Sequence, residues 1–438
     1  MKRLFLGILV VFWLTAGVFA QNSLLEKKAQ DFVDTLNRQE FFQAVENFDK
    51  SMKQAFPASK LENIWKKLMG SIGPFKKQEG VRTEELGASK AVFVLCHFEK
   101  GSLEVKVVFD KKGQMAGLFF VPPAKPWEIP GYANKDTFRE EDILFGKPGW
   151  ELPGNLTIPL GSGTFPCIVL VHGSGPNDRD ETCGFSRPFK DLAYGLTSRD
   201  IAVLRYEKRT RKYHEKCAAE KQFTVWQETV EDAVEAVSFL KKRSDIDPKR
   251  IFVLGHSLGG HMMPGIARDC PDAAGFIICA GPVRPLEDLM IEQLEYIFSR
   301  KKEVSVEEKA YLEKVKQAVP TIKSFNRGNV SSFSNIIGAP PYYWMTLSEY
   351  KPLDLGKQIN RPLLILQGER DYQVTVKEFQ LWKEALKGNP NVTFFLFPTL
   401  NHLFIKGVGE STPEEYQKPG HVDEEVIGKI SEWLGKKK

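Results

Sequence analysis

The stretch Ile251-Phe-Val-Leu-Gly-His-Ser-Leu-Gly-Gly260 joins a short apolar run to a segment compatible with a helix. Its pattern Gly-x-Ser-x-Gly is typical of a sharp strand-to-helix turn, in which small flanking residues relieve crowding and the serine hydroxyl is exposed. The pattern predicts a nucleophile at Ser257 and an elbow formed by Gly255, His256 and Gly259. A glycine-rich turn with an incidental serine would have the same pattern, so the prediction of a nucleophile depends on residues elsewhere in the chain.

Two later predicted strands end in the side chains that a serine nucleophile needs. Leu363–Gln367 is followed by Gly-Glu-Arg-Asp371, and Thr393–Phe397 is followed within a few residues by His402. A serine hydroxyl is a weak nucleophile, so it needs a base, and the base needs an acid to orient it. The chain order Ser, Asp, His, each after a strand, is that of α/β-hydrolases. Asp371 and His402 are therefore the predicted partners, with Glu369 as an alternative orienting acid.

A second glycine-rich turn follows another apolar run. Cys167–Val171 leads into His172-Gly-Ser-Gly-Pro176, and such a turn presents backbone N–H groups. Acyl transfer forms an oxyanion that needs fixed donors, each worth roughly 10²–10³ in rate. We expect the amides of Leu258 and Ser174 to serve, with Gly173 and Gly175 as neighbouring candidates. A phosphate cradle is disfavoured, because the chain has no Gly-x-x-x-x-Gly-Lys-Ser/Thr pattern.

The chain from residue 135 onward alternates apolar runs with amphipathic segments. Unbroken aliphatic runs are typical of strands covered on both faces, as in a parallel sheet flanked by helices. Trp226–Lys242 has apolar residues at helical spacing and basic residues at its end, which predicts a connecting helix. The predicted strands are Cys167–Val171, Ile201–Tyr206, Ile251–Gly255, Gly275–Ala280, Leu363–Gln367 and Thr393–Phe397.

The residues before this part have a different pattern. Within 24–121, helical spacing of apolar residues changes after Gly87 to alternation typical of strands. These residues predict a small α+β domain with three helices followed by strands. The proline-rich residues 122–134 predict a semi-rigid linker, so the second domain is expected over 135–438.

An insertion separates two strands of the second domain. About eighty residues lie between Ala280 and Leu363, far more than an ordinary connection. Apolar residues at helical spacing and an aromatic cluster at Pro340–Trp344 predict a helical cap at about 283–355. The cap either supplies an apolar acyl or aryl pocket or only buries itself as a helical layer.

Length and composition narrow the classes of protein. The chain has 438 residues, 42% hydrophobic and 27% charged, with a formal charge of +5, values that fit a folded protein of two or three domains. The charges are interspersed, so nucleic-acid binding is not indicated. Lys2 and Arg3, an apolar run and Ala20 predict a cleaved signal peptide over 1–20, hence a secreted or periplasmic protein without stable membrane insertion. Among six cysteines, Cys183 and Cys217 lie in polar segments and are the candidate disulfide.

The motif residues resemble a known group. The loop His172-Gly-Ser-Gly-Pro followed by Asn-Asp-Arg-Asp180, and the segment Leu204–Arg209, resemble exported bacterial α/β-hydrolase esterases, which commonly have Asp where this chain has Glu207. Residues 24–121 are similar to the small NTF2-like domain of unknown function that precedes such hydrolases. The resemblance implies an α/β-hydrolase fold with a mostly parallel sheet and helical cap, and hydrolysis of carboxylic esters without a cofactor or metal.

Three hypotheses about function follow. The first is a serine carboxylesterase that acts on small soluble esters with a short acyl or an aryl group, through an acyl-enzyme. The second is a serine aminopeptidase of the same fold, which would need carboxylates for the substrate's amine. The third is a non-catalytic binding protein. The amino-terminal domain could shape the substrate cavity, form a homodimer contact or act as a spacer. Candidate amine-binding carboxylates are Glu287, Asp288, Glu292 and Glu295.

Overall fold

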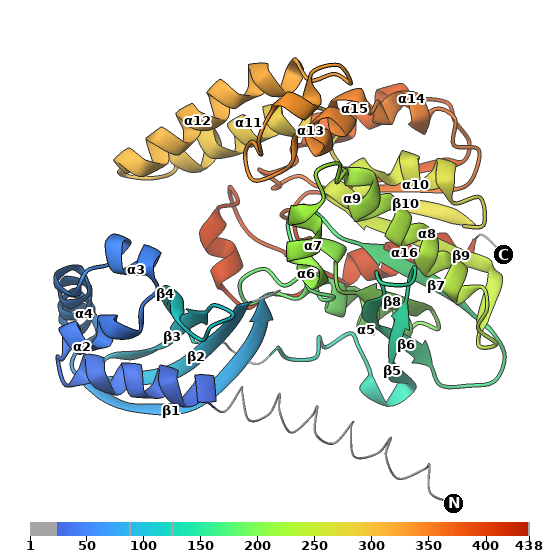
Figure 1. Ribbon diagram of the computed structural model, residues 1–438. Coiled ribbons are helices and arrows are strands. Elements are labelled where there is room, and N and C mark those ends of the chain that lie inside the picture. Colours follow the sequence, from blue (N-terminus) through green and yellow to red (C-terminus); the bar gives the residue numbers. More distant parts are fainter. Residues whose placement is uncertain (1–23, 87–88, 124–126, 437–438) are drawn as a thin grey trace, which may run out of the picture. The chain divides into compact units, whose positions relative to one another are not determined.

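The computed structural model describes residues 24–86, 89–123 and 127–436 (Figure 1). The chain divides into two compact units, Met1–Lys125 and Pro126–Lys438, each with its own hydrophobic core. The signal peptide predicted over residues 1–20 lies outside the described residues.

The first unit is an α+β structure in which helices precede one antiparallel sheet. A helix over residues 24–37 is followed by α2 (Phe41–Ala44), α3 (Lys50–Ala55) and α4 (Ala58–Ile72). The sheet has the order β1-β2-β3-β4, and buried apolar side chains of the helices cover it. Trp65 of α4 is fully buried among aromatic rings of the strands. The strands are β1 (Phe75–Leu86), β2 (Ser89–Phe98), β3 (Gly101–Phe109) and β4 (Met115–Val121).

Strand β1 was not predicted, because its sequence is charged. It lies at the edge of the sheet and pairs only with β2, so it needs no apolar face on both sides. Arg82 shows what replaces apolar packing: its guanidinium binds the Glu104 carboxylate of β3 at 2.7 Å and lies over the Phe93 ring of β2.

The second unit contains an eight-stranded sheet of the order β12-β11-β10-β9-β7-β8-β6-β5. Strands β7 to β12 are parallel, and β5 and β6 join as an antiparallel edge. The predicted α/β-hydrolase fold class is confirmed. Strands β5 and β6 were not predicted from the sequence. The strands are β5 (Phe138–Phe145), β6 (Leu152–Pro159), β7 (Phe165–Val171), β8 (Ala202–Tyr206), β9 (Ile246–His256), β10 (Gly275–Cys279), β11 (Leu363–Gly368) and β12 (Val392–Phe397).

Helices cover both faces of this sheet, so the unit has three layers. On one face, α5 (Pro188–Thr197) and α16 (Glu424–Gly435) pack onto alternate strand residues. On the other face lie α8 (Asp232–Leu240), α10 (Met263–Asp269) and α15 (Val376–Ala385). Because both faces are buried, the central strands are apolar throughout, which made them recognisable in the sequence. The predicted helix Trp226–Lys242 begins instead with a π-helical turn, η3 (Trp226–Glu231).

The residues expected to form a linker are partly attached to the second unit. The Trp127 indole donates a hydrogen bond to the fully buried Asp191 of α5 at 2.9 Å, and its ring packs edge-on against Tyr194. Tyr132 donates its hydroxyl hydrogen to the carbonyl of Val422 at 2.7 Å. The end of the predicted linker 122–134 is therefore part of the hydrolase unit rather than a free connection.

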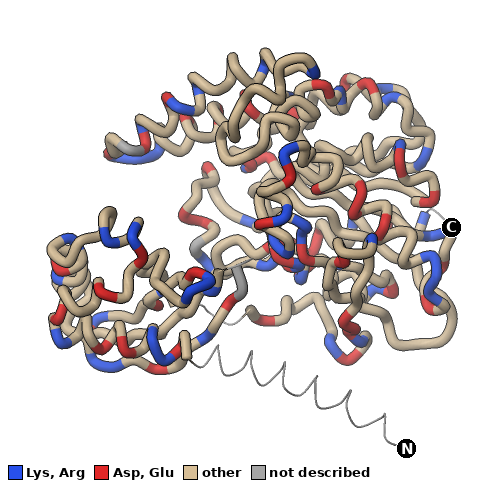
Figure 2. The backbone as a smooth tube through the Cα atoms, in the orientation of Figure 1, with Lys and Arg blue, Asp and Glu red and all other residues tan. Residues whose placement is uncertain are grey.

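The insertion after β10 forms a helical cap. Helices α11 (Leu286–Ser299), α12 (Val306–Lys323) and α13 (Pro341–Glu349) lie together at one side of the second unit, at the top of Figure 1. Along the described residues of both units, Lys and Arg are interspersed with Asp and Glu (Figure 2). Within the described residues, no helix combines the length and apolar character needed to cross a membrane.

Candidate active site

Ser257 stands where β9 turns sharply into α9 (Leu258–His261). Its φ is +52°, a backbone conformation that costs a non-glycine residue energy and is characteristic of a nucleophile elbow. The turn leaves no room for side chains beside it: a Cβ on Gly255 would lie 2.3 Å from the backbone of Gly259. A Cβ on Gly259 would lie 2.3 Å from the carbonyl oxygen of Val171 in β7. The sequence pattern is thus explained by close backbone contacts.

Asp371 and His402 meet beyond the ends of β11 and β12. The Nδ1 atom of His402 lies 2.7 Å from Oδ2 of Asp371, and both side chains are almost fully buried. The other carboxylate oxygen of Asp371 accepts hydrogen bonds from the backbone amides of Gln373 and Val374, each at 2.8 Å. The orientation of the Asp371 carboxylate is therefore fixed, and its contact with Nδ1 orients the imidazole ring of His402.

Three other titratable residues of this region do not take the place of Asp371 or His402. Glu369, the alternative acid, is exposed, so it does not replace Asp371. His172 is buried against Phe189 and Tyr206, and burial lowers its pKa to about 4, so it is neutral. His261 lies within 2.9 Å of the carbonyl oxygen of Pro282 and has a structural partner.

The first glycine-rich turn passes directly beside the elbow. A Cβ on Gly173 would lie 3.0 Å from the Cβ of Ser257, which explains the glycine. The N–H of Gly173 donates to the Glu181 carboxylate at 2.5 Å, so this amide already has a partner, and its assignment to an oxyanion hole stays a prediction. Ser174 lines the cavity together with Leu258, and the assignment of their two amides to the oxyanion hole stays a prediction. Gly175 is not among the residues that line this cavity.

Side chains from the segments that carried the resemblance hold this turn in place. Asn177 donates to the carbonyl oxygens of Gly173 and Ser174, both at 3.1 Å, and buried Lys208 donates to the Gly173 carbonyl at 2.7 Å. Arg179 binds Glu207 at 2.9 Å, which ties the loop after the turn to the end of β8. Glu207, which stands where the similar esterases commonly have Asp, thus still forms an ion pair.

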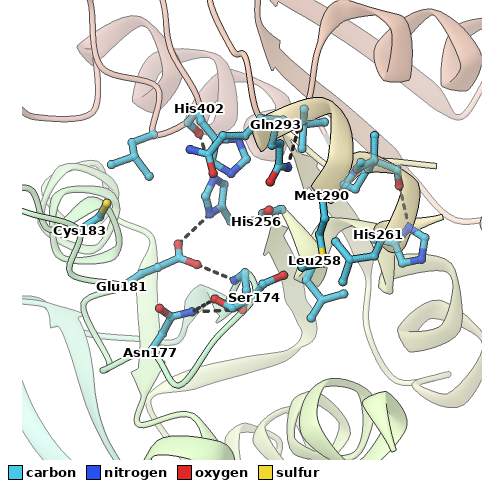
Figure 3. A pocket seen from close by; sticks show the side chains of 18 of the residues that line it. Ser174, Asn177, Glu181, Cys183, His256, Leu258, His261, Met290, Gln293 and His402 are labelled. Carbon is cyan, nitrogen blue, oxygen red and sulfur yellow. Dashed lines mark hydrogen bonds and ion pairs between the residues drawn. The ribbon is translucent and has the colours of Figure 1, made fainter. Parts of the chain in front are cut away.

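His256 connects the two loops that flank the nucleophile. Its Nε2 lies 2.9 Å from the carbonyl oxygen of His402, and its Nδ1 lies 2.9 Å from Oε2 of Glu181 (Figure 3). A carboxylate this close to Nδ1 favours the charged form of the ring, so we predict that His256 is an imidazolium. Burial by itself would lower the pKa of His256, but Glu181, the His402 carbonyl and the Asp371 charge together outweigh burial and raise that pKa. Burial likewise opposes the ionisation of Glu181, yet His256 keeps the Glu181 pKa below its usual value.

Replacing Glu181 with glutamine should reveal this ion pair in a pH titration of stability. The raised pKa of His256 stabilises the folded state below about pH 6.5, and this stabilisation is lost as the pH rises through the pKa of the folded state. The lowered pKa of Glu181 stabilises the folded state above about pH 4.5. The unfolding free energy lost in Glu181→Gln should therefore be largest between about pH 4.5 and 6.5, about 1–3 kcal/mol, and shrink at higher pH. Chemical denaturation at each pH measures it.

Glu207→Gln is the matched control for that titration. The partners of Glu207 are Arg179 and Arg211, which stay charged throughout the range. Its effect should persist from neutral to alkaline pH. An effect of Glu181→Gln that also stays constant up to pH 9 would contradict an imidazolium at His256.

A cavity of about 400 Å³ opens above these residues. Ser257, His402, Ser174 and Leu258 line one side, and residues of α11 line the other, which confirms that the cap contributes to this cavity. Figure 3 labels Met290 and Gln293 of α11, which line the same cavity as His256 and Leu258. The cap residues that line the cavity are Arg284, Leu286, Leu289, Met290 and Gln293.

The candidate disulfide between Cys183 and Cys217 is absent. All six cysteines are free thiols, and Cys183 lines this cavity whereas buried Cys217 lies against a different one. Cys217 is instead held near the backbone carbonyl of Arg209. The pair was proposed because both cysteines lie in polar segments, but polar surroundings in the sequence do not bring two thiols within bonding distance.

Three positioning residues were missed in the sequence. Glu181 binds the backbone N–H of Gly173, and Asn177 and Lys208 bind its carbonyl oxygen. All three residues lie within or next to the motif segments. An acidic residue just after Asn-Asp-Arg-Asp, and a lysine after a buried strand, were the available signals. Their partners are backbone atoms of a loop, which no side-chain pattern records.

A serine on a strained strand-to-helix turn, beside a buried histidine–aspartate pair at the ends of parallel strands, defines a serine hydrolase of the α/β-hydrolase fold. Residues 166–406 match the family model described as serine aminopeptidase, S33, and residues 29–118 match a protein family of unknown function, DUF3887. The chain belongs to this S33 family of hydrolases, so the predicted enzyme class is confirmed. The roles of the individual catalytic residues stay predictions.

Known proteins similar to the chain include a curated relative along its whole length. Esterase EstD of Thermotoga maritima is 40% identical over 434 residues, which cover 99% of this chain and 98% of the relative. An esterase of Pyrococcus furiosus of known structure has a TM-score of 0.45 at 18% identity, covering 72% of this chain and 97% of its own. The acylaminoacyl peptidase of Pyrococcus horikoshii has a TM-score of 0.49 at 15% identity, covering 83% of this chain and 56% of its own.

Proposed function

We propose that the protein is a secreted serine carboxylesterase that hydrolyses small, uncharged esters with a short acyl or an aryl group. The observation that carries the proposal is the buried Asp371–His402 pair, whose histidine lines the same cavity as the strained Ser257. The relative named an esterase, which is similar over nearly the whole chain, supports the choice of ester bonds.

The reaction follows from the arrangement of these residues. Ser257 Oγ attacks the acyl carbon while Nε2 of His402 takes its proton, and the amides of Leu258 and Ser174 bind the developing oxyanion. The carbon–oxygen bond to the alcohol then breaks, and His402 returns the proton to the leaving alkoxide. Water attacks the acyl-enzyme by the same route and releases the acid. Asp371 stabilises the imidazolium and keeps Nδ1 protonated throughout.

The aminopeptidase alternative shares the family description and requires a free carboxylate for the substrate's ammonium group. The candidate carboxylates on α11 already have partners: Lys323 binds Asp288 at 2.7 Å, and Lys316 binds Glu295 at 2.8 Å. Glu292 is held by Arg284 at 2.8 Å. Glu287 is buried and is not among the residues lining the cavity, and burial raises its pKa. These contacts favour an uncharged substrate.

A fluorophosphonate probe and two substrate classes test the proposal. We expect one covalent adduct, mapped by mass spectrometry to the peptide that contains Ser257, and none after the enzyme is first inactivated with a serine-directed inhibitor. The kcat/KM for p-nitrophenyl butyrate should exceed that for alanine p-nitroanilide by about 10²-fold or more. Faster cleavage of the anilide would favour the peptidase, and no adduct together with no turnover would favour a binding protein.

We propose export on the strength of the first twenty residues, with their basic start, apolar run and terminal Ala20. Expression of the full chain in a bacterial host should yield a mature protein in the periplasm or medium that begins at Gln21. Recovery of the intact chain in the cytoplasm would contradict this proposal.

A further inference from the structure

A second cavity, of about 320 Å³, lies in the hydrolase unit next to the first one. Its walls come from the glycine-rich turn, from α7 (His214–Ala219) and from the cap around α13. Two residues line both cavities: Ser174, from the proposed oxyanion hole, and Leu286, from the start of α11. The two cavities therefore adjoin at the place where the ester carbonyl would bind.

This arrangement separates the two halves of an ester. The carbonyl carbon attacked by Ser257 carries an acyl group and an alkoxy oxygen, which must point in different directions. The alkoxy oxygen receives its proton from His402, and a general acid has to be within hydrogen-bond reach. His402 lines the first cavity and not the second. The alcohol thus leaves through the first cavity, and the acyl group points past Ser174.

We propose that the second cavity is the acyl subsite and that it takes an uncharged acyl group ending in an aromatic ring. This inference rests on the proposed esterase function and names the substrate class for it. The wall is aromatic and apolar, and such surfaces bind a ring by offset or edge-on packing. The residues that provide it are Phe223, Ile337, Pro340, Tyr343 and Trp344.

The carboxylate that lines this cavity is already paired, so it does not call for a charged acyl group. Glu228 is the acidic residue among its lining residues, and it is 5% exposed. Its carboxylate is already bound by the Lys208 ammonium at 3.0 Å, the Thr210 hydroxyl at 3.1 Å and the Tyr343 hydroxyl at 2.6 Å. A carboxylate with these three donors offers little to a substrate cation, and the lysine that neutralises it offers nothing to an anion. A neutral ring is the ligand that this lining suits.

The cap wall is held in a costly conformation. Ile337 has a φ of +45°, a left-handed conformation that is unfavourable for a β-branched residue. The backbone bridge between Ile336 and Ala339 closes this turn, and Trp344 donates its indole N–H to the Ile336 carbonyl at 2.8 Å. Such strain is found where function fixes a loop. The turn lines the cavity together with the glycine-rich loop.

Filling the cavity from this wall tests the proposal. Ala339 lines the second cavity but not the first, so Ala339→Phe should displace an aromatic acyl group. The readout is the ratio of kcat/KM for p-nitrophenyl 3-phenylpropionate to that for p-nitrophenyl acetate, which share one leaving group. We expect this ratio to fall at least about tenfold in Ala339→Phe. Ala310→Phe makes the same change at an exposed position of α12 away from both cavities, and its ratio should equal that of the wild type.

A second series distinguishes the acyl from the alcohol side. With acetyl esters of methanol and of benzyl alcohol, followed by acid release, the ratio should be the same in Ala339→Phe and wild type. A change in the alcohol ratio instead of the acyl ratio, or no change in either, would overturn the assignment. If the wild type prefers p-nitrophenyl octanoate to phenylpropionate, the aromatic class is wrong. Wild type without turnover on any ester would refute the esterase proposal instead, and acetate turnover by Ala339→Phe shows that the variant is folded.

Discussion

Ser257→Ala is expected to lower kcat/KM on p-nitrophenyl acetate by about 10⁴-fold or more, because no other group can form the acyl-enzyme. The residual rate would come from the oxyanion donors and substrate binding, which the substitution leaves in place. Alanine can occupy the φ of +52° at about the same cost as serine, so the elbow should persist. The kinetics are measured with the purified variant, and its melting temperature should stay within a few degrees of wild type.

A serine elsewhere in the second unit provides the control for this result. Ser332 is exposed in the short helix η4 (Val330–Ser332) and lines neither cavity, so Ser332→Ala should keep the wild-type rate. Activity of Ser257→Ala above a few per cent of wild type, with contaminating esterase excluded by a parallel mock purification, would remove Ser257 from the mechanism.

Much of the fold was predictable because burial leaves a direct record in the sequence. Strands such as β7 and β11 are covered on both faces, and their unbroken aliphatic runs marked them to within two residues. The edge strands β1 and β5 carry charged residues on solvent-facing positions, and nothing in composition separates such strands from loops. Prediction thus succeeded where hydrophobic burial alone determines the structure.

The candidate site divides in the same way. Ser257, Asp371 and His402 could be proposed because each follows a strand in a fixed chain order, and the strands bring them to one edge of the sheet. Glu181 accepts a hydrogen bond from the N–H of Gly173, and Lys208 donates one to its C=O. Both contacts depend on the three-dimensional course of a loop. Backbone partners carry no residue identity, so this part of the site required the structure.

Asp371→Asn should abolish most activity while keeping the shape of the site. The backbone amides of Gln373 and Val374 both donate to Oδ1 of Asp371, so an asparagine must keep its oxygen there. Its NH₂ group then takes the place of Oδ2, 2.7 Å from Nδ1 of His402. Two donors cannot face each other, so the imidazole shifts its proton from Nδ1 to Nε2. Nε2 would then point a hydrogen at the nucleophile and could not accept one, and kcat should fall about 10⁴-fold.

Glu369→Gln separates this tautomer effect from a general loss of negative charge in the turn. Glu369 is exposed and lies two residues before Asp371. Glu369→Gln removes the same negative charge without touching His402, so the kcat of this variant should stay within about twofold of wild type. Gln367 sharpens the comparison, because its side-chain amide donates to Oδ2 of Asp371 at 3.2 Å and would face a second NH₂ group in Asp371→Asn. That conflict predicts a small additional loss of stability in Asp371→Asn alone. Equal losses of kcat in the two variants would show that the orienting role does not belong to Asp371.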